Sequence, residues 1–118
     1  MKRDLEDLFP AKSLQTLRIY AYKINTSSHE GMIKVGQTTR EVKKRIEEQL
    51  KTVAITDYTI LLDELGYSED GTVITDHQLR AHLKKKGFSN PKGEWMKCTL
   101  VDIKVALSEL KSGVSISG

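Results

Sequence analysis

The segment at residues 17–45 limits the possible folds of this chain more than any other part of its sequence. Apolar and polar side chains alternate at residues 17–24, and β-branched residues are frequent at 32–37, so both stretches are predicted to be strands. The polar residues 25–31 between them have the length of a hairpin loop. The sequence GQTT at residues 36–39 then leads into a basic helix. This order predicts that aromatic hydroxyls, a glycine and an arginine lie close together.

The rest of the chain mixes helices and strands. Val42, Ile46 and Leu50 recur at helical spacing, and Thr39 is a suitable N-cap for the helix that they indicate. The elements predicted after the hairpin are helices at residues 40–51, 75–86 and 100–111 and strands at 59–65 and 94–98. Because their order has no regular βαβ repeat, we predict an α+β fold, an α/β sandwich with a small, mainly antiparallel central sheet flanked by helices.

Length and composition favour one globular domain without a membrane segment. We expect a domain at residues 17–111, an N-terminal helical extension at 1–16 and a linker-like tail at 112–118. The composition of this tail suits either a longer parent protein or a natural frayed terminus. No apolar run approaches the roughly 18 residues of a membrane-spanning helix. The charged N-terminus lacks the apolar core of a secretion signal, and Cys98 has no disulfide partner in the chain. A cytoplasmic location follows by default.

The charge balance permits nucleic-acid binding without requiring it. The net charge is +3 and the sequence pI is about 9.0, which is mildly basic. Two of the predicted helices concentrate the basic side chains. These candidate phosphate contacts are Arg40, Lys43, Lys44 and Arg45 on the first and Arg80, Lys84, Lys85 and Lys86 on the second. The alternative is that both are solvated helix faces.

These features together resemble the GIY-YIG nuclease superfamily, and most closely its branch named after a phage T5 reading frame. The resemblance covers residues 17–100. Arg18-Ile19-Tyr20 stands at the GIY position, and Lys34-Val35-Gly36 stands at the YIG position. The closing Gly93-Glu94-Trp95-Met96 resembles the Gly-Glu-Trp-Phe signature of that branch.

The resemblance implies a site for phosphodiester hydrolysis. In this family a tyrosine assists the attacking water, an arginine contacts the phosphate, and one carboxylate holds a divalent metal. The matching positions are Tyr20, Arg45 and Asp76, where Asp76 replaces the glutamate of the family. The implied cofactor is Mg²⁺ (or Mn²⁺), which accepts a single protein carboxylate because it keeps several waters. Further candidate catalytic groups are Tyr22, Lys34 and His77.

Several of these residues have a second interpretation. Thr75 or Asp76 can cap the helix that begins there. Glu94 is an alternative metal ligand, or a partner for Arg80. A phenol with a pKa near 10 is a poor base at neutral pH unless a nearby cation lowers that pKa, which limits Tyr20.

Two features of the GQTT junction suit phosphate binding. Gly36 is expected to give a backbone without Cβ where the strand turns into the helix. The amides around Thr38 and Thr39 would lie at the helix N-terminus, where they can hold a phosphate.

The predicted function is a metal-dependent DNA endonuclease domain. The sequence at residues 75–77 and 86–88 is also similar to domains at the N-terminus of DEAD/DEAH-type helicases in bacterial restriction-like proteins, so a helicase/ATPase domain in the same longer chain is the implied partner beside DNA. Arg18, Lys34 and Asp76 depart from the family pattern. The substitutions at Lys34 and Asp76 favour an alternative, a catalytically weakened module that binds DNA or positions a partner. A third interpretation is a protein-interaction domain with solvated basic faces.

Overall fold

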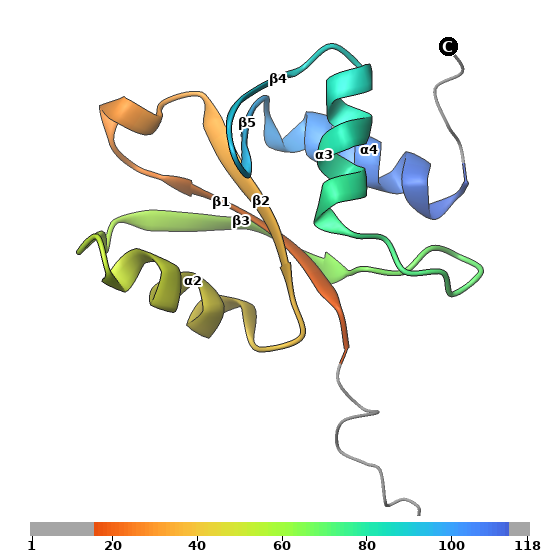
Figure 1. Cartoon of the computed structure of the whole chain (residues 1–118), viewed down its shortest axis with the longest axis horizontal. Helices are drawn as coiled ribbons and strands as arrows, with labels where there is room; N and C mark the ends of the chain where they lie inside the picture. Colours follow the sequence, from red (N-terminus) through yellow and green to blue (C-terminus); the bar gives the residue numbers. More distant parts are fainter. Residues whose placement is uncertain (1–15, 114–118) are drawn as a thin grey trace, which may run out of the picture.

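The computed structural model describes residues 16–113 of the chain. Residues 1–15 of the predicted N-terminal extension and residues 114–118 of the predicted tail lie outside the described residues. Within them, one antiparallel sheet carries helices on both faces, which confirms the predicted α+β class (Figure 1). The helices are α2 (Val42–Lys51), α3 (Asp76–Lys85) and α4 (Leu100–Lys111).

The sheet of the described chain has five strands in the order β3-β1-β2-β5-β4, and every neighbouring pair is antiparallel. The strands are β1 (Arg18–Ile24), β2 (Met32–Thr38), β3 (Tyr58–Leu65), β4 (Ser89–Lys92) and β5 (Trp95–Lys97). The predicted hairpin is therefore confirmed, and its loop contains a short 3-10 helix, η2 (Ser27–His29). The sequence did not predict β4, because it is short and contains Pro91, which normally argues against a strand.

The helix after the hairpin begins later than predicted. Its N-cap is Glu41, so the prediction that Thr39 caps a helix from Arg40 is wrong. Thr38 still belongs to β2, and its hydroxyl accepts the backbone N–H of Arg40 at 3.0 Å, which holds the chain in a turn before α2. The predicted amides of Thr38 and Thr39 consequently do not lie at the helix N-terminus.

Capping boxes fix the starts of both later helices. Thr75 caps α3 by accepting the backbone N–H of Gln78, whose side chain accepts the Thr75 N–H in return. Thr99 and Asp102 form the same reciprocal pair at α4. Of the two predicted caps, Thr75 and Asp76, the structure has Thr75. Gly87 follows α3 with φ of +101°, a conformation that glycine adopts without steric cost.

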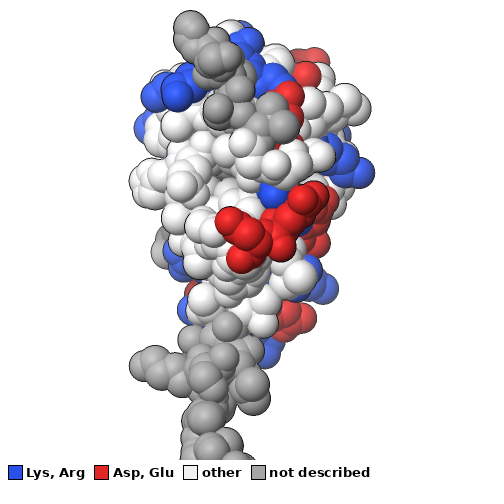
Figure 2. Space-filling model, turned by 90° about the vertical axis from the view of Figure 1, so that its right-hand side faces the viewer, with Lys and Arg blue, Asp and Glu red and all other residues white. Residues whose placement is uncertain are grey.

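The loop between β3 and α3 projects from one side of the molecule (Figure 1). Figure 2 shows that side face-on, with Asp and Glu side chains gathered near its centre. Lys and Arg lie scattered around this acidic centre rather than in one continuous patch. An electrostatic attraction for DNA on this side is therefore opposed by like charge at its centre.

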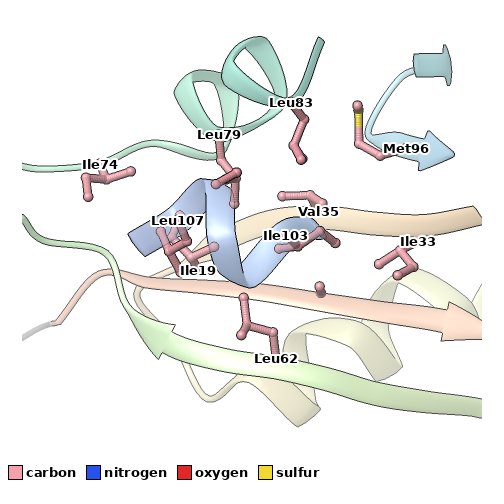
Figure 3. Packing of buried hydrophobic residues seen from close by; sticks show 12 residues of the cluster. Ile19, Ile33, Val35, Leu62, Ile74, Leu79, Leu83, Met96, Ile103 and Leu107 are labelled. Atoms are coloured by element: carbon pink, nitrogen blue, oxygen red, sulfur yellow. The ribbon is translucent and has the colours of Figure 1, made fainter. Parts of the chain in front are cut away.

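The sheet separates two apolar clusters, because successive side chains of a strand point to opposite faces. The larger cluster joins β1, β2 and β3 to α3 and α4 (Figure 3). Its labelled members are Ile19, Ile33, Val35, Leu62, Ile74, Leu79, Leu83, Met96, Ile103 and Leu107. The second cluster lies under α2. It consists of Tyr20, Tyr22, Ile24, Val42, Ile46 and Leu50. The predicted stripe of Val42, Ile46 and Leu50 is thus confirmed as buried.

None of the helices in residues 16–113 has the length and apolar character needed to cross a membrane.

Two positions on α4 test how far burial against α3 stabilises the fold. Leu107 is 1% exposed and Val101 is 67% exposed. We expect Leu107→Ala to lower the free energy of unfolding by roughly 2–5 kcal/mol, because it leaves a cavity in the larger cluster. Val101→Ala should change it by less than about 0.5 kcal/mol. Urea denaturation followed by circular dichroism measures both, and equal losses would contradict the packing described for α4.

Candidate active site

The centre of the candidate site is a pair of stacked phenols. Tyr20 and Tyr22 lie two apart on β1 and share the sheet face under α2, as predicted, with ring centroids 6.2 Å apart and an interplanar angle of 16°. Gln49 on α2 lies across both hydroxyls. Its Nε2 donates to the Tyr20 hydroxyl oxygen at 3.1 Å, and the Tyr22 hydroxyl donates to its Oε1, also at 3.1 Å.

Gly36 makes room for the Tyr20 phenol. The two residues are cross-strand partners in the β1–β2 register. A Cβ on Gly36 would lie 2.6 Å from both Cζ and the hydroxyl oxygen of Tyr20, a distance that no real Cβ contact allows. Gly36 lies inside β2, and it is not among the glycines with positive φ. The predicted reason for this glycine, a turn from strand to helix, is therefore wrong; the close approach of the phenol requires it.

Charged side chains surround the phenols. Lys34, the cross-strand partner of Tyr22, places its Nζ 5.9 Å from the centroid of the Tyr22 ring and 3.9 Å from Oε1 of Glu94. Arg45 on α2 interacts with the Tyr20 hydroxyl and is 41% exposed. Two cations and one carboxylate thus lie around the two hydroxyls, and the cations can attract a phosphate.

Burial decides the protonation of these groups. It raises the pKa of Tyr20, and the hydrogen bond from Gln49 and the charge of Arg45 offset only part of that rise. The nearby cation Arg45 does lower the pKa of the phenol, but burial outweighs it, so Tyr20 stays protonated at neutral pH. Burial also lowers the pKa of Lys34, although Glu94 opposes this, so Lys34 gives up a proton more readily than a solvated lysine.

Asp76 is engaged in a buried ion pair. Its Oδ2 accepts from Nη1 of Arg80 at 2.8 Å, and both side chains are less than 10% exposed. The same Arg80 nitrogen donates to the carbonyl of Val35 at 2.7 Å, which ties α3 to β2. A lone carboxylate already neutralised by a guanidinium does not offer the open, oxygen-rich position that a divalent ion needs. In this arrangement Asp76 does not fit Mg²⁺, and residues 16–113 contain no group of three or more His, Cys, Asp or Glu suited to a metal.

Arg80 and Glu94 have different partners from those suggested by the sequence. Arg80 pairs with Asp76, whereas Glu94 pairs with Lys34. Arg80 is buried, so the alternative that it lies on a solvated helix face is wrong, whereas its contact with DNA phosphate stays a prediction. His77 is exposed, and its Nδ1 lies 3.1 Å from Nη2 of Arg80.

A groove of about 560 Å³ lies between α3 and the β4–β5 hairpin. It begins beside the candidate site, because Glu94 lines it and also pairs with Lys34. The other lining residues are His77, Arg80, Ala81, Lys84, Asn90 and Gly93. The cations that line it, Arg80 and Lys84, suit the path of a nucleic-acid backbone.

Some of the remaining basic residues have acidic partners within the fold, and others are exposed to solvent. Arg40 pairs with Glu48, and the Lys86 ammonium donates to Glu109 at 2.8 Å, so each has an acidic partner within the fold. Lys84 and Lys85 on α3 are exposed, and so are Lys43 and Lys44 on α2. These four lysines keep the predicted capacity to contact phosphate.

Sequence reasoning missed Gln49. A glutamine on a helix surface carries no chemical signature of its own. One signal could have found it: Gln49 lies four residues after Arg45, beside the buried stripe of α2, and residues at that spacing lie on the same helix face. The structure shows that this face points at the Tyr20 hydroxyl.

Comparison with known proteins gives one match. A family model described as the T5orf172 domain matches residues 19–111. This family is related to GIY-YIG and other nuclease-like domains. No curated protein and no solved structure gives a significant match.

The close approach at Gly36 gives a direct test of the site geometry. We expect Gly36→Ala to destabilise the domain by about 1–3 kcal/mol, because the added methyl group must displace the Tyr20 ring. The loss should shrink when Tyr20 is also replaced by Ala, since the clash is then removed. Denaturation of the two single variants and the double variant gives the coupling. Additive losses would mean that Tyr20 does not lie over Gly36.

Proposed function

This chain belongs to the T5orf172 domain family, which makes it a nuclease-like or DNA-binding domain, and we propose that it is a DNA endonuclease domain that hydrolyses phosphodiester bonds. The observation that carries the proposal is the cluster of Arg45, Lys34 and Glu94 around the Tyr20–Tyr22 pair. Phosphodiester hydrolysis needs positive charge on the phosphate, a proton acceptor for the water and a proton donor for the leaving oxygen.

Arg45 is proposed to bind the scissile phosphate. It is the half-exposed cation of the cluster, and its interaction with the Tyr20 hydroxyl directs it over the sheet. A guanidinium can hold two phosphate oxygens at once, which orients the phosphorus for attack. The exposed Lys84 and Lys85 would hold the backbone further along the strand without reading its sequence.

Lys34 and Glu94 are proposed to move protons. Lys34 has a lowered pKa, which makes it a better donor to the leaving oxygen than a solvated lysine. Glu94 is exposed enough to meet water, with 39% of its side chain accessible, and Asp76 is occupied by Arg80. Glu94 therefore accepts the proton of the attacking water in this scheme. Tyr20, whose pKa is raised, donates a hydrogen bond rather than accepting a proton.

Metal dependence, with Mg²⁺ or Mn²⁺ at Asp76, stays a prediction from the family resemblance. No step of the proposed mechanism passes through a metal, since Asp76 is paired with Arg80. The further proposal that this domain is the N-terminal module of a longer restriction or helicase protein rests on the sequence similarity at residues 75–77 and 86–88.

A second candidate function is DNA binding with weakened catalysis. The raised pKa of Tyr20 and the buried Asp76–Arg80 pair favour it, because both remove groups that could activate water. In that case the same groove and lysines would hold DNA or position a partner domain. Cleavage separates this candidate from the nuclease.

Replacement of Arg45 tests the nuclease. We expect Arg45→Ala to reduce nicking of supercoiled plasmid about 100-fold or more, because it removes a charge that stabilises the transition state. Lys51→Ala, which removes an exposed charge from the same helix, is the matched control and should nick at nearly the normal rate. The assay is run with Mg²⁺, with Mn²⁺ and with EDTA, so that metal dependence is measured separately. Equal nicking by Arg45→Ala and the wild type would remove Arg45 from the mechanism.

Replacement of the α3 lysines tests the DNA path. Lys84→Ala with Lys85→Ala should weaken binding of any DNA duplex and reduce the slope of log affinity against log salt by about 1 for each phosphate that is no longer neutralised. Lys104→Ala, at an exposed position on α4, should leave both quantities unchanged. Fluorescence anisotropy at several salt concentrations gives these values. An unchanged slope in the double variant would place the DNA elsewhere.

A further inference from the structure

The Gln49 side chain joins the two phenols into a hydrogen-bond chain with one direction. The Tyr22 hydroxyl donates to Oε1 of Gln49, and Nε2 of Gln49 donates to the oxygen of Tyr20. An amide has one acceptor end and one donor end, so its orientation fixes which phenol donates and which accepts. The chain therefore runs from Tyr22 through Gln49 to Tyr20.

The Tyr20 hydroxyl is left as a donor at the end of this chain. Arg45 also interacts with Tyr20, and a guanidinium can only donate. Both described partners of the Tyr20 hydroxyl, Gln49 and Arg45, thus direct N–H groups at its oxygen. Among residues 16–113 the hydroxyl has no hydrogen-bond acceptor for its own proton.

The surroundings of Tyr20 favour an anion as the missing acceptor. Arg45 is next to the hydroxyl, and Lys34 lies over the neighbouring Tyr22 ring. Tyr20 is 1% exposed and its own phenol fills the place of the missing Gly36 Cβ, so an anion would reach the hydroxyl past the half-exposed side chain of Arg45. A phosphate oxygen drawn in by Arg45 would meet a hydroxyl whose proton is already available.

We propose that Gln49 is a positioning residue that orients the Tyr20 hydroxyl so that it donates its proton to a phosphate oxygen of bound DNA. Gln49 itself does not touch the phosphate; it acts through Tyr20. This inference rests on the proposed function for its substrate, because it takes the phosphate to be that of a DNA strand. The amide identity of residue 49 matters more than its size, since only an amide both accepts from one phenol and donates to the other.

Gln49→Glu tests the direction of the hydrogen-bond chain from Tyr22 to Tyr20, because glutamate has nearly the same size and shape as glutamine. A carboxylate only accepts, so both phenols would donate to it and the Tyr20 proton would point away from the phosphate. We expect kcat for plasmid nicking to fall about 10–100-fold, with the affinity for DNA nearly unchanged. Lys51→Gln changes the net charge by the same amount at an exposed position of α2, and it should behave as the wild type.

Acidification provides the rescue. Protonation of the carboxylate introduced at position 49 gives it an O–H donor, which restores the original direction of the hydrogen-bond chain. The ratio of Gln49→Glu to wild-type kcat should therefore rise as the pH falls from about 8 to about 5. Taking the ratio also cancels pH effects that are common to both proteins. The charged and titratable groups around residue 49 that both proteins share are Arg45 on α2, Lys34 on β2, Glu94 ahead of β5 and the two phenols on β1. A ratio that stays flat at a low value would indicate a structural role and overturn the proposal.

Tyrosine NMR separates this inference from the nuclease proposal. In protein labelled with ¹³C at the tyrosine Cζ, addition of a short DNA duplex should shift the Tyr20 signal in the wild type and in Lys51→Gln. The shift should be lost in Gln49→Glu although the duplex still binds, and Tyr67, outside the site, serves as the reference. A Tyr20 response without nicking would refute the nuclease and keep the inference. No Tyr20 response in the wild type, or an equal response in Gln49→Glu, would overturn the inference whether or not plasmid is cut.

Discussion

The candidate site depends on the close approach of the Tyr20 phenol to the backbone of Gly36. The phenol can lie flat against β2 only because its cross-strand partner has no Cβ. This places the Tyr20 hydroxyl under α2, where Gln49 and Arg45 reach it. One missing methyl group in a central strand pair thus determines where the polar groups of α2 meet the sheet.

The same arrangement sets the chemistry through burial. Phenols and a lysine removed from water favour their neutral forms, so the pKa of Tyr20 is raised and the pKa of Lys34 is lowered. The carboxylates divide between two roles. Asp76 is held by Arg80 inside the fold, whereas Glu94 stays at the rim beside Lys34. A proton acceptor near the groove is therefore more readily supplied by Glu94 than by Tyr20 or Asp76.

Much of the fold could be predicted from local patterns. The hairpin followed from alternation in its strands, and α2 followed from the spacing of Val42, Ile46 and Leu50, because alternation and a buried stripe depend only on nearby residues. The start of α2 could not be predicted in this way. Thr39 is as good a cap as many others, but β2 extends through Thr38 and delays the helix. The strand β4 could not be predicted from its own residues, because its pairing with β5 rather than its intrinsic propensity makes it a strand.

The sequence by itself determined the α+β class and the family resemblance, and it indicated Tyr20, Gly36 and Arg45 as candidate site residues. Each of these depends on residue types and their spacing along the chain. Only the tertiary structure decided their partners. The ion pair of Asp76 with Arg80 joins residues four apart in α3, and only its burial and the contact of Arg80 with the Val35 carbonyl are tertiary. The pair of Lys34 with Glu94 depends on β5 lying beside β2, and the bridge from Gln49 to both phenols depends on how α2 packs on the sheet. A charged or amide side chain bonds to whichever group the packing brings within reach.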